Sequence, residues 1–153
     1  MTNEATFAMG CFWHPDDFFS KIKGVQKTTV GYTGGHVPDP NYNQVCGGST
    51  GHAEAVRIEF DPDQISYEEL VKLFFKEHNP TTVNRQGPDV GEQYRSIIFY
   101  HDEKQRAIAE RVKQKFDDSG AYPNPIVTQI VKAPEFYEAE EYHQKYFEKI
   151  GRS

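Results

Sequence analysis

The sequence has 153 residues, enough for one domain with a sizeable core, and we expect residues 1–153 to form a single domain. A formal net charge of -6 argues against an electrostatic nucleic-acid binder, and two cysteines cannot build a disulfide scaffold but suit a reducing compartment. The polar start and the lack of a long apolar run predict no signal peptide and no membrane span, so we expect a cytoplasmic protein.

Strand and helix patterns alternate along the chain in the order βαββαβαβα, and the first six elements follow the ferredoxin-like βαββαβ pattern. We therefore expect an α+β fold, a two-layer sandwich with a ferredoxin-like core on a mixed sheet plus an extra strand and helices. Strands are predicted at residues 5–9, 26–32, 53–60, 93–100 and 125–131, and helices at residues 15–22, 66–78, 102–120 and 138–149.

Two irregular segments, residues 33–51 and 81–91, interrupt this alternation. Loops of this length inside a compact domain are usually functional or disordered. Tyr42, Val45 and Cys46 predict that the first segment is ordered, because such side chains need a surface to pack on.

Cys11 lies at the predicted turn between the strand 5–9 and the helix 15–22. Free backbone N–H groups at a helix start favour negative charge, so this position is expected to lower the thiol pKa and favour the nucleophilic thiolate. The alternative is a buried structural cysteine packed against Phe12 and Trp13. The stretch alone leaves both interpretations open.

Glu54 is an anomaly on the predicted strand 53–60. Val56, Ile58 and Phe60 alternate onto one face of that strand, and Glu54 falls on the same face. Buried carboxylates are rare unless they are paired or functional, and burial would raise the pKa of this group and make it a proton donor near neutral pH. The alternative is that the strand frays here and the side chain reaches water.

The remaining polar residues favour thiol chemistry over other classes. No pair of the HxH, CxxC or HExxH type and no phosphate loop is present, so no metal or cofactor is expected. Glu140, Glu141 and His143 fall on a charged helix and are interpreted as a solvent-facing surface. Tyr42 and Tyr94, at the edges of the irregular segments, are candidate site residues.

Seven stretches carry a family resemblance, in order and over nearly the whole chain. They are GCFW at 10–13, GYTGG at 31–35, GHAEA at 51–55, HNPTT at 78–82, NRQG at 84–87 with DVG at 89–91, QYRS at 93–96 and AEEYHQ at 139–144. With these stretches the sequence closely resembles the methionine sulfoxide reductase A family. The resemblance implies reduction of the S epimer of methionine sulfoxide, free or peptide-bound, to methionine.

The resemblance also implies roles for individual residues. They are the nucleophile Cys11, the acid Glu54, the hydrogen-bond donors Tyr42 and Tyr94, and a pocket for the substrate methyl formed by Phe12 and Trp13. Attack on the sulfoxide sulfur would leave Cys11 as a sulfenic acid, while Glu54 delivers a proton. Asp89 also resembles a family site residue, with a role either in orienting a tyrosine or water or in capping its loop.

Two features depart from the family pattern. His14 stands where the family usually has glycine, and it either tunes the thiolate when charged or faces solvent. Many family members resolve the sulfenic acid with cysteines on a tail, and this sequence has no cysteine after Cys46. Cys46 would resolve Cys11 only if their Cα atoms come within about 7 Å. We favour direct attack by an external thiol such as glutathione, glutaredoxin or thioredoxin.

Two other classes of protein fit part of the pattern. A peptide-binding module would use the same aromatic side chains as a binding surface around a structural Cys11. A thiol peroxidase would also form a sulfenic acid at Cys11. An inward-facing Glu54 separates the reductase from both, because neither a peptide grip nor peroxide attack needs a carboxylic acid there.

Overall fold

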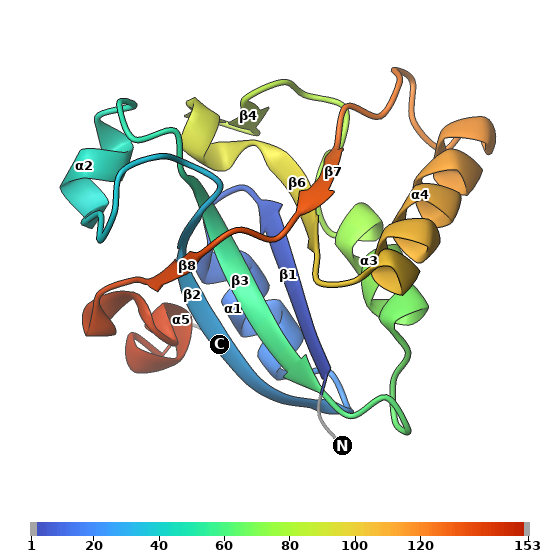
Figure 1. The fold of residues 1–153 in the computed structure, drawn as a ribbon, viewed down its shortest axis with the longest axis horizontal. Helices are drawn as coiled ribbons and strands as arrows, with labels where there is room; N and C mark the ends of the chain where they lie inside the picture. Colours follow the sequence, from blue (N-terminus) through green and yellow to red (C-terminus); the bar gives the residue numbers. More distant parts are fainter. Residues whose placement is uncertain (1–2, 152–153) are drawn as a thin grey trace.

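Six strands form one mixed sheet in the computed structural model, which describes residues 3–151 (Figure 1). Their bounds are β1 Asn3–Met9, β2 Val25–Thr33, β3 Ala53–Phe60, β6 Ser96–Tyr100, β7 Gln129–Lys132 and β8 Phe136–Glu138. They lie in the order β7-β6-β1-β3-β2-β8. β6 and β7 pair in parallel, and the other neighbours pair antiparallel.

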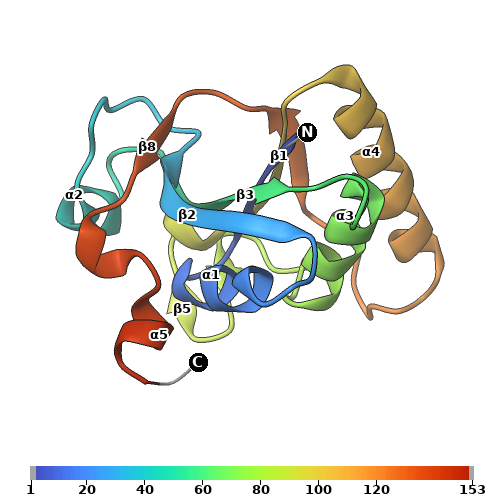
Figure 2. The ribbon, with the colours of Figure 1, turned by 90° about the horizontal axis from the view of Figure 1, so that it is seen from below.

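Helices α1 (Trp13–Ser20) and α3 (Tyr67–Lys76) lie on one face of the sheet, and α4 (Glu103–Asp118) packs beside α3 (Figure 2). A mixed sheet with packed helices is thus confirmed. The other elements are short: α2 Tyr42–Cys46, the hairpin strands β4 Arg85–Gln86 and β5 Asp89–Val90, the 3₁₀ turns η1 Glu92–Tyr94 and η2 Glu141–His143, and α5 Tyr146–Lys149.

The main core fills the space between the sheet and the helices. The ring of Phe7 on β1 lies 5.8 Å from that of Phe19 on α1 and 5.0 Å from that of Phe74 on α3. All three side chains are fully buried, and each burial contributes about 1.5–3 kcal/mol. A smaller cluster on the opposite face is covered by the chain that runs from β7 to β8 (Figure 1) and consists of Ala8, Ala53, Ala55, Ile97 and Phe99.

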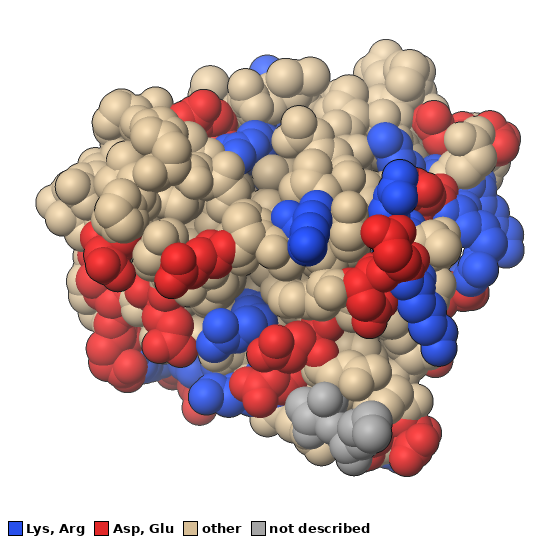
Figure 3. Space-filling view, in the orientation of Figure 1, with Lys and Arg blue, Asp and Glu red and all other residues tan. Residues whose placement is uncertain are grey.

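The surface carries charge unevenly. Figure 3 shows a neutral area over α2, where residues 40–53 contain no Lys, Arg, Asp or Glu. Acidic side chains gather on the same face near β8 and the C-terminal segment. Within residues 3–151, no helix combines the length and the apolar character that crossing a membrane requires.

The predicted helix at 138–149 is wrong. This part of the chain forms β8, the η2 turn and the four-residue α5 instead. A helix cannot continue because Lys145 adopts a left-handed backbone conformation with φ 55°. Tyr142 on the η2 turn is 57% exposed.

Other boundaries also differ from the predictions. Residues 92–94 form the η1 turn, so that β6 begins at Ser96 rather than at residue 93. The last predicted strand is shorter and spans Gln129–Lys132. The irregular segment 33–51 is ordered, as expected, and contains α2, which starts with a capping box between Asn41 and Gln44.

A buried ionic cluster joins α1, β2 and the C-terminal segment. Asp16 is fully buried and accepts hydrogen bonds from the Thr28 hydroxyl (2.5 Å), the Lys145 backbone N–H (2.7 Å) and the Lys145 ammonium (3.1 Å). The Lys145 ammonium also donates to the Thr28 carbonyl oxygen at 2.7 Å. A buried charge with this many partners is satisfied, and loss of one partner leaves the others uncompensated.

We predict that Asp16→Asn destabilises the protein by about 2–3 kcal/mol, which is less than a fully buried pair would lose, because Lys145 keeps 34% of its side chain exposed. Urea denaturation of the variant measures this. Asp17→Asn is the matched control, since Asp17 pairs with the exposed Lys21 and should lose at most about 1 kcal/mol. Equal losses in the two variants would contradict the role of the cluster.

Candidate active site

Cys11 occupies a tight turn between β1 and α1. The turn requires Gly10, which has φ +98°, and a Cβ there would lie 2.8 Å from the Gln86 side chain. The Cys11 thiol is half-buried, and burial raises its pKa to about 12 despite the opposing effect of the Trp13 backbone N–H. The predicted lowering of this pKa by the helix start is therefore wrong in this structure, because loss of hydration outweighs the N–H group.

Glu54 contacts the residue after Cys11 and faces inward, as expected. Its side chain is 1% exposed, and Oε1 accepts a hydrogen bond from the backbone N–H of Phe12 at 3.3 Å. Within the described residues, the buried Oε2 has no hydrogen-bond partner. Burial raises the carboxyl pKa to about 7, the Phe12 N–H opposes this, and the charge of Asp89 adds to it. The site therefore holds a carboxylic acid that is substantially protonated at neutral pH.

The phenols of Tyr42 on α2 and Tyr94 on the η1 turn belong to the same site. Burial, followed by the charges of Glu54 and its neighbours, raises the pKa of Tyr94 to about 12. Burial and a hydrogen bond with the Cys46 thiol raise the pKa of Tyr42. Both phenols keep their protons at neutral pH and are available as donors.

Asp89 and Cys46 belong to this group of interacting residues. Charges on Glu54, Asp89 and Cys46 each act on the Cys11 thiol. Asp89 is half-buried on β5, whereas Cys46 is exposed at the end of α2, and neither cysteine is in a disulfide. The structure thus brings six of the candidate residues into one site: Cys11, Tyr42, Cys46, Glu54, Asp89 and Tyr94.

Phe12 and Trp13 enter an aromatic cluster, which we define as Phe12, Trp13, Tyr42, Tyr142 and His143. Phe12 is fully buried, with its ring 5.2 Å from that of His143, and Trp13 is half-buried. The Tyr42 and Tyr142 rings lie 4.6 Å and 4.1 Å from the His143 ring. This cluster gives the site an apolar wall next to Cys11.

Sequence reasoning misplaced His143. It is 1% exposed and lies at the centre of the aromatic cluster, where Nδ1 accepts a hydrogen bond from the Trp13 indole at 3.0 Å. The predicted helix put it on a solvent-facing surface, whereas the η2 turn directs it inward.

Two further residues hold the loop that carries Tyr42. Glu140 accepts hydrogen bonds from the Tyr32 hydroxyl (2.9 Å) and from the Tyr42 backbone N–H (3.0 Å), so it too was misplaced as solvent-facing. His52 is buried, accepts from the Gly35 N–H at 3.0 Å and lies 2.6 Å from the Val37 oxygen. The signal that could have found both is their place in stretches that carry the family resemblance.

Of the two alternatives for His14, the structure favours the one in which the side chain faces solvent. Its Nε2 lies 3.5 Å from the Glu77 carboxylate at the end of α3, and its side chain is half-exposed. His14 is not among the groups that shift the Cys11 pKa. Nor do residues 3–151 contain a group of three His, Cys, Asp or Glu side chains that could hold a metal ion.

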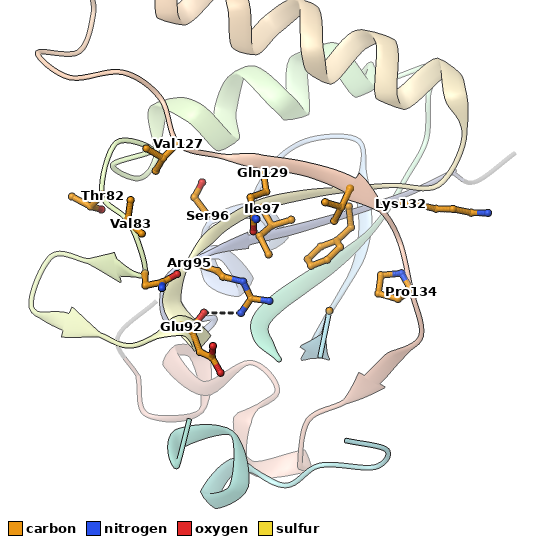
Figure 4. A pocket seen from close by; sticks show the side chains of 14 residues that line it. Thr82, Val83, Glu92, Arg95, Ser96, Ile97, Val127, Gln129, Lys132 and Pro134 are labelled. Atoms are coloured by element: carbon orange, nitrogen blue, oxygen red, sulfur yellow. Dashed lines mark hydrogen bonds between the residues drawn. The ribbon is translucent and has the colours of Figure 1, made fainter. Parts of the chain in front are cut away.

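A separate hollow of about 630 Å³ opens beside β6 and β7 (Figure 4). In it Arg95 donates hydrogen bonds to the carbonyl oxygens of Glu92 and Gly51, both at 2.8 Å. Cys11 and Glu54 do not line this hollow, so it is distinct from the site described above.

The chain is similar to known proteins over nearly its whole length. The family model "Peptide methionine sulfoxide reductase" matches residues 3–152. The "Peptide methionine sulfoxide reductase MsrA" of Methanosarcina acetivorans is 58% identical over 148 residues, which cover 97% of this chain and 79% of that protein.

Two solved structures of yeast Mxr1 are similar to the chain. Mxr1 from Saccharomyces cerevisiae in reduced form has a TM-score of 0.92 and 36% identity, covering 99% of this chain and 87% of that one. Mxr1 in complex with Trx2 has a TM-score of 0.68 and 26% identity, covering 95% and 84%. Since a family model spans nearly all of the chain and a relative shares more than half of its residues, the chain belongs to the peptide methionine sulfoxide reductase family.

Proposed function

We propose that the chain reduces the S epimer of methionine sulfoxide, free or in peptides, with Cys11 as nucleophile and Glu54 as proton donor. The observation that carries this proposal is the contact between the Glu54 carboxyl and the N–H of Phe12, the residue after the thiol. This contact holds the carboxyl beside the attacking sulfur, and the burial of the carboxyl, not the hydrogen bond, supports a neutral acid there. A peptide-binding module or a thiol peroxidase would have no use for such an acid.

The chemistry is a two-electron transfer from thiol to sulfoxide. Cys11 Sγ attacks the sulfoxide sulfur, and the oxygen gains negative charge as it does so. Glu54 donates a proton to this oxygen, while the Tyr42 and Tyr94 hydroxyls donate hydrogen bonds to it. The bond between the substrate sulfur and its oxygen then breaks as the oxygen passes to Cys11 Sγ, and the proton lost by the thiol replaces the one that Glu54 donated. The products are methionine and a Cys11 sulfenic acid.

The high pKa of the Cys11 thiol fits this sequence of events. At a pKa of about 12, the thiol keeps its proton in the absence of substrate. The thiol is therefore less reactive toward non-specific oxidants than a thiolate would be. A neutral Glu54 removes one of the charges that raise this pKa, since its ionised form repels the thiolate. The protonated carboxyl therefore supports both the attack and the later proton delivery.

Epimer selection would come from the aromatic cluster. Phe12 and Trp13 offer an apolar surface to the substrate methyl, while the oxygen points to the donors. Exchanging methyl and oxygen would place a strong acceptor against aromatic rings with no donor, which costs free energy.

The scaffold and setting complete the proposal. We describe β1, α1, β2, β3, α3 and β6 as a ferredoxin-like core, supported by the strand order β6-β1-β3-β2. A cytoplasmic, reducing location is supported by two free cysteines. A thioredoxin-type protein is the favoured reductant, because the similar yeast Mxr1 has been solved with Trx2.

We predict that Cys11→Ser abolishes the reaction, since the one other cysteine of the sequence, Cys46, is exposed at the end of α2 rather than at the turn before α1. The assay is racemic methionine sulfoxide with dithiothreitol, and the methionine formed is measured. The wild type should stop near half conversion, having consumed the S epimer. Turnover by Cys11→Ser would refute the nucleophile, and full conversion by the wild type would refute the epimer choice.

Glu54→Gln is predicted to slow single turnover by roughly two to four powers of ten, the usual reach of general acid catalysis. Glutamine has the same shape and still donates a hydrogen bond, but it cannot deliver the proton. Glu59→Gln on the other face of β3 is the control and should react at the wild-type rate. Rapid-quench kinetics distinguishes these cases, and a wild-type rate in Glu54→Gln would assign the carboxyl a structural role.

The same variant tests the raised pKa through stability. Folding raises the Glu54 pKa from 4.5 to about 7, so the folded state binds the proton more tightly. The contribution of Glu54 to stability is thus full below pH 4.5 and is lost, by about 3 kcal/mol, as the pH rises from 4.5 through 7. Glu54→Gln should lack this decline when denaturation is compared at pH 5 and pH 8.

We predict that Cys46 does not resolve the sulfenic acid. One equivalent of methionine sulfoxide should consume one thiol per chain and leave Cys46 open to alkylation, because Cys46 is exposed at the end of α2. Cys46→Ser should keep most of its turnover with dithiothreitol or thioredoxin. Loss of two thiols and a Cys11–Cys46 bridge in mass spectrometry would show instead that the loop completes the cycle.

A further inference from the structure

His143 is the most constrained group near the site that the proposed reaction does not use. Its backbone N–H donates to the Glu140 carbonyl oxygen at 2.9 Å. On the other side, the Gln144 side chain accepts from the Val30 N–H and donates to the Val30 oxygen, both at 2.9 Å. The ring therefore projects from a segment that is tied down on both sides.

The hydrogen bond with Trp13 defines the state of the imidazole. An indole N–H can only donate, so His143 Nδ1 must carry a lone pair and the proton must sit on Nε2. Burial also lowers the His143 pKa, although the charge of Glu140 opposes this. Within residues 3–151, the buried Nε2 has no hydrogen-bond partner. Burial of the Nε2–H group without an acceptor costs free energy, and the hydrogen bond from Trp13 to Nδ1 must offset that cost.

Stacking alone does not hold the Trp13 indole in one orientation. Its ring lies 3.7 Å from that of Tyr146 at an interplanar angle of 9°, which fixes the plane of the indole. A half-turn of the indole about its Cβ–Cγ bond keeps the ring in that plane and exchanges its two edges. The bond from Nε1 to His143 acts at the ring edge and removes this freedom.

We propose that His143 is a positioning residue, which fixes the in-plane orientation of Trp13 and thereby shapes the pocket for the substrate methyl. This inference rests on the proposed function, in which Trp13 contacts the methyl. The contact exists in both the bound substrate and the transition state, so its loss should raise KM and leave kcat nearly unchanged.

Three variants distinguish the effect of the hydrogen-bond acceptor at Nδ1 from the effect of the aromatic ring. His143→Phe keeps a ring but removes the acceptor. His143→Asn places an amide oxygen near the position of Nδ1, and His143→Gln places one nearer to Nε2. Phe and Gln should raise KM for methionine sulfoxide by roughly three- to tenfold, the usual effect of one hydrogen bond, with kcat within about twofold. Asn should restore KM. If His143→Phe does not fold, the Asn and Gln pair still decides the question.

A second measurement needs no turnover. Trp13 is the single tryptophan of the chain, so its indole N–H gives one resonance in a proton–nitrogen correlation spectrum. That resonance should shift and exchange faster with solvent in His143→Phe and His143→Gln, and should return toward the wild-type position in His143→Asn. His101→Phe is the control, because His101 bonds Thr6 on the sheet and should change neither KM nor the resonance.

The outcomes distinguish this inference from the proposed function. A wild-type KM or an unmoved indole resonance in His143→Phe would overturn the positioning role. So would a His143→Asn variant that behaves like His143→Phe. A wild-type protein without any methionine sulfoxide turnover would refute the proposed function, and the resonance would still report whether His143 orients Trp13.

Discussion

The site depends on burying a carboxyl group at the end of a core strand. Glu54 occupies a position of β3 where Val56 and Ile58 predict an apolar residue, and it is as buried as they are. Within the described residues, only one of its oxygens has a hydrogen-bond donor. The protein therefore stabilises the charged carboxylate less well than water does. The fold therefore holds this group close to the midpoint of its titration at neutral pH, at a cost in stability that the large aromatic core offsets.

The C-terminal segment determines the shape of the site although it contributes no group that reacts. Glu140 fixes the loop with Tyr42, His143 contacts Trp13, and Lys145 joins the segment to the start of α1. Two of these contacts use the side chains of the segment and one uses the backbone N–H of Lys145, and none of them depends on a regular helix. A left-handed backbone at Lys145 is strained, and the hydrogen bonds of its N–H and ammonium to Asp16 compensate for that strain.

The periodicity of the sequence predicted those helices and strands that are determined by residues close together in the sequence. The strand at 53–60 has the predicted bounds, and α3 is capped by Ser66, the residue at which the predicted helix begins. The prediction of a C-terminal helix was wrong because the irregular conformation of this segment is stabilised by contacts between Lys145 and Asp16, which are more than a hundred residues apart in the sequence. The inward face of Glu54 was predictable for the same reason as the strand, since it needs only the alternation of side chains.

The site was predictable in its members and not in its electrostatics. Cys11, Glu54, Tyr42 and Tyr94 were identified together, mainly through the family resemblance. The pKa of Cys11 was predicted in the wrong direction, because the depth of burial at a turn cannot be read from a helix start. His143 was missed because its inward direction follows from the η2 turn, which no periodicity signals.

The side-chain ties of the C-terminal segment have a consequence for local unfolding. Three backbone amides far apart in the sequence, those of Val30, Tyr42 and Lys145, are each hydrogen-bonded by a carboxylate or amide side chain that links this segment to the rest of the molecule. Detachment of the segment would break all three bonds in one opening event. Their hydrogen-exchange rates should then share one opening free energy, lower than that of the sheet, so that the aromatic wall of the site and the tail behave as a single cooperative unit.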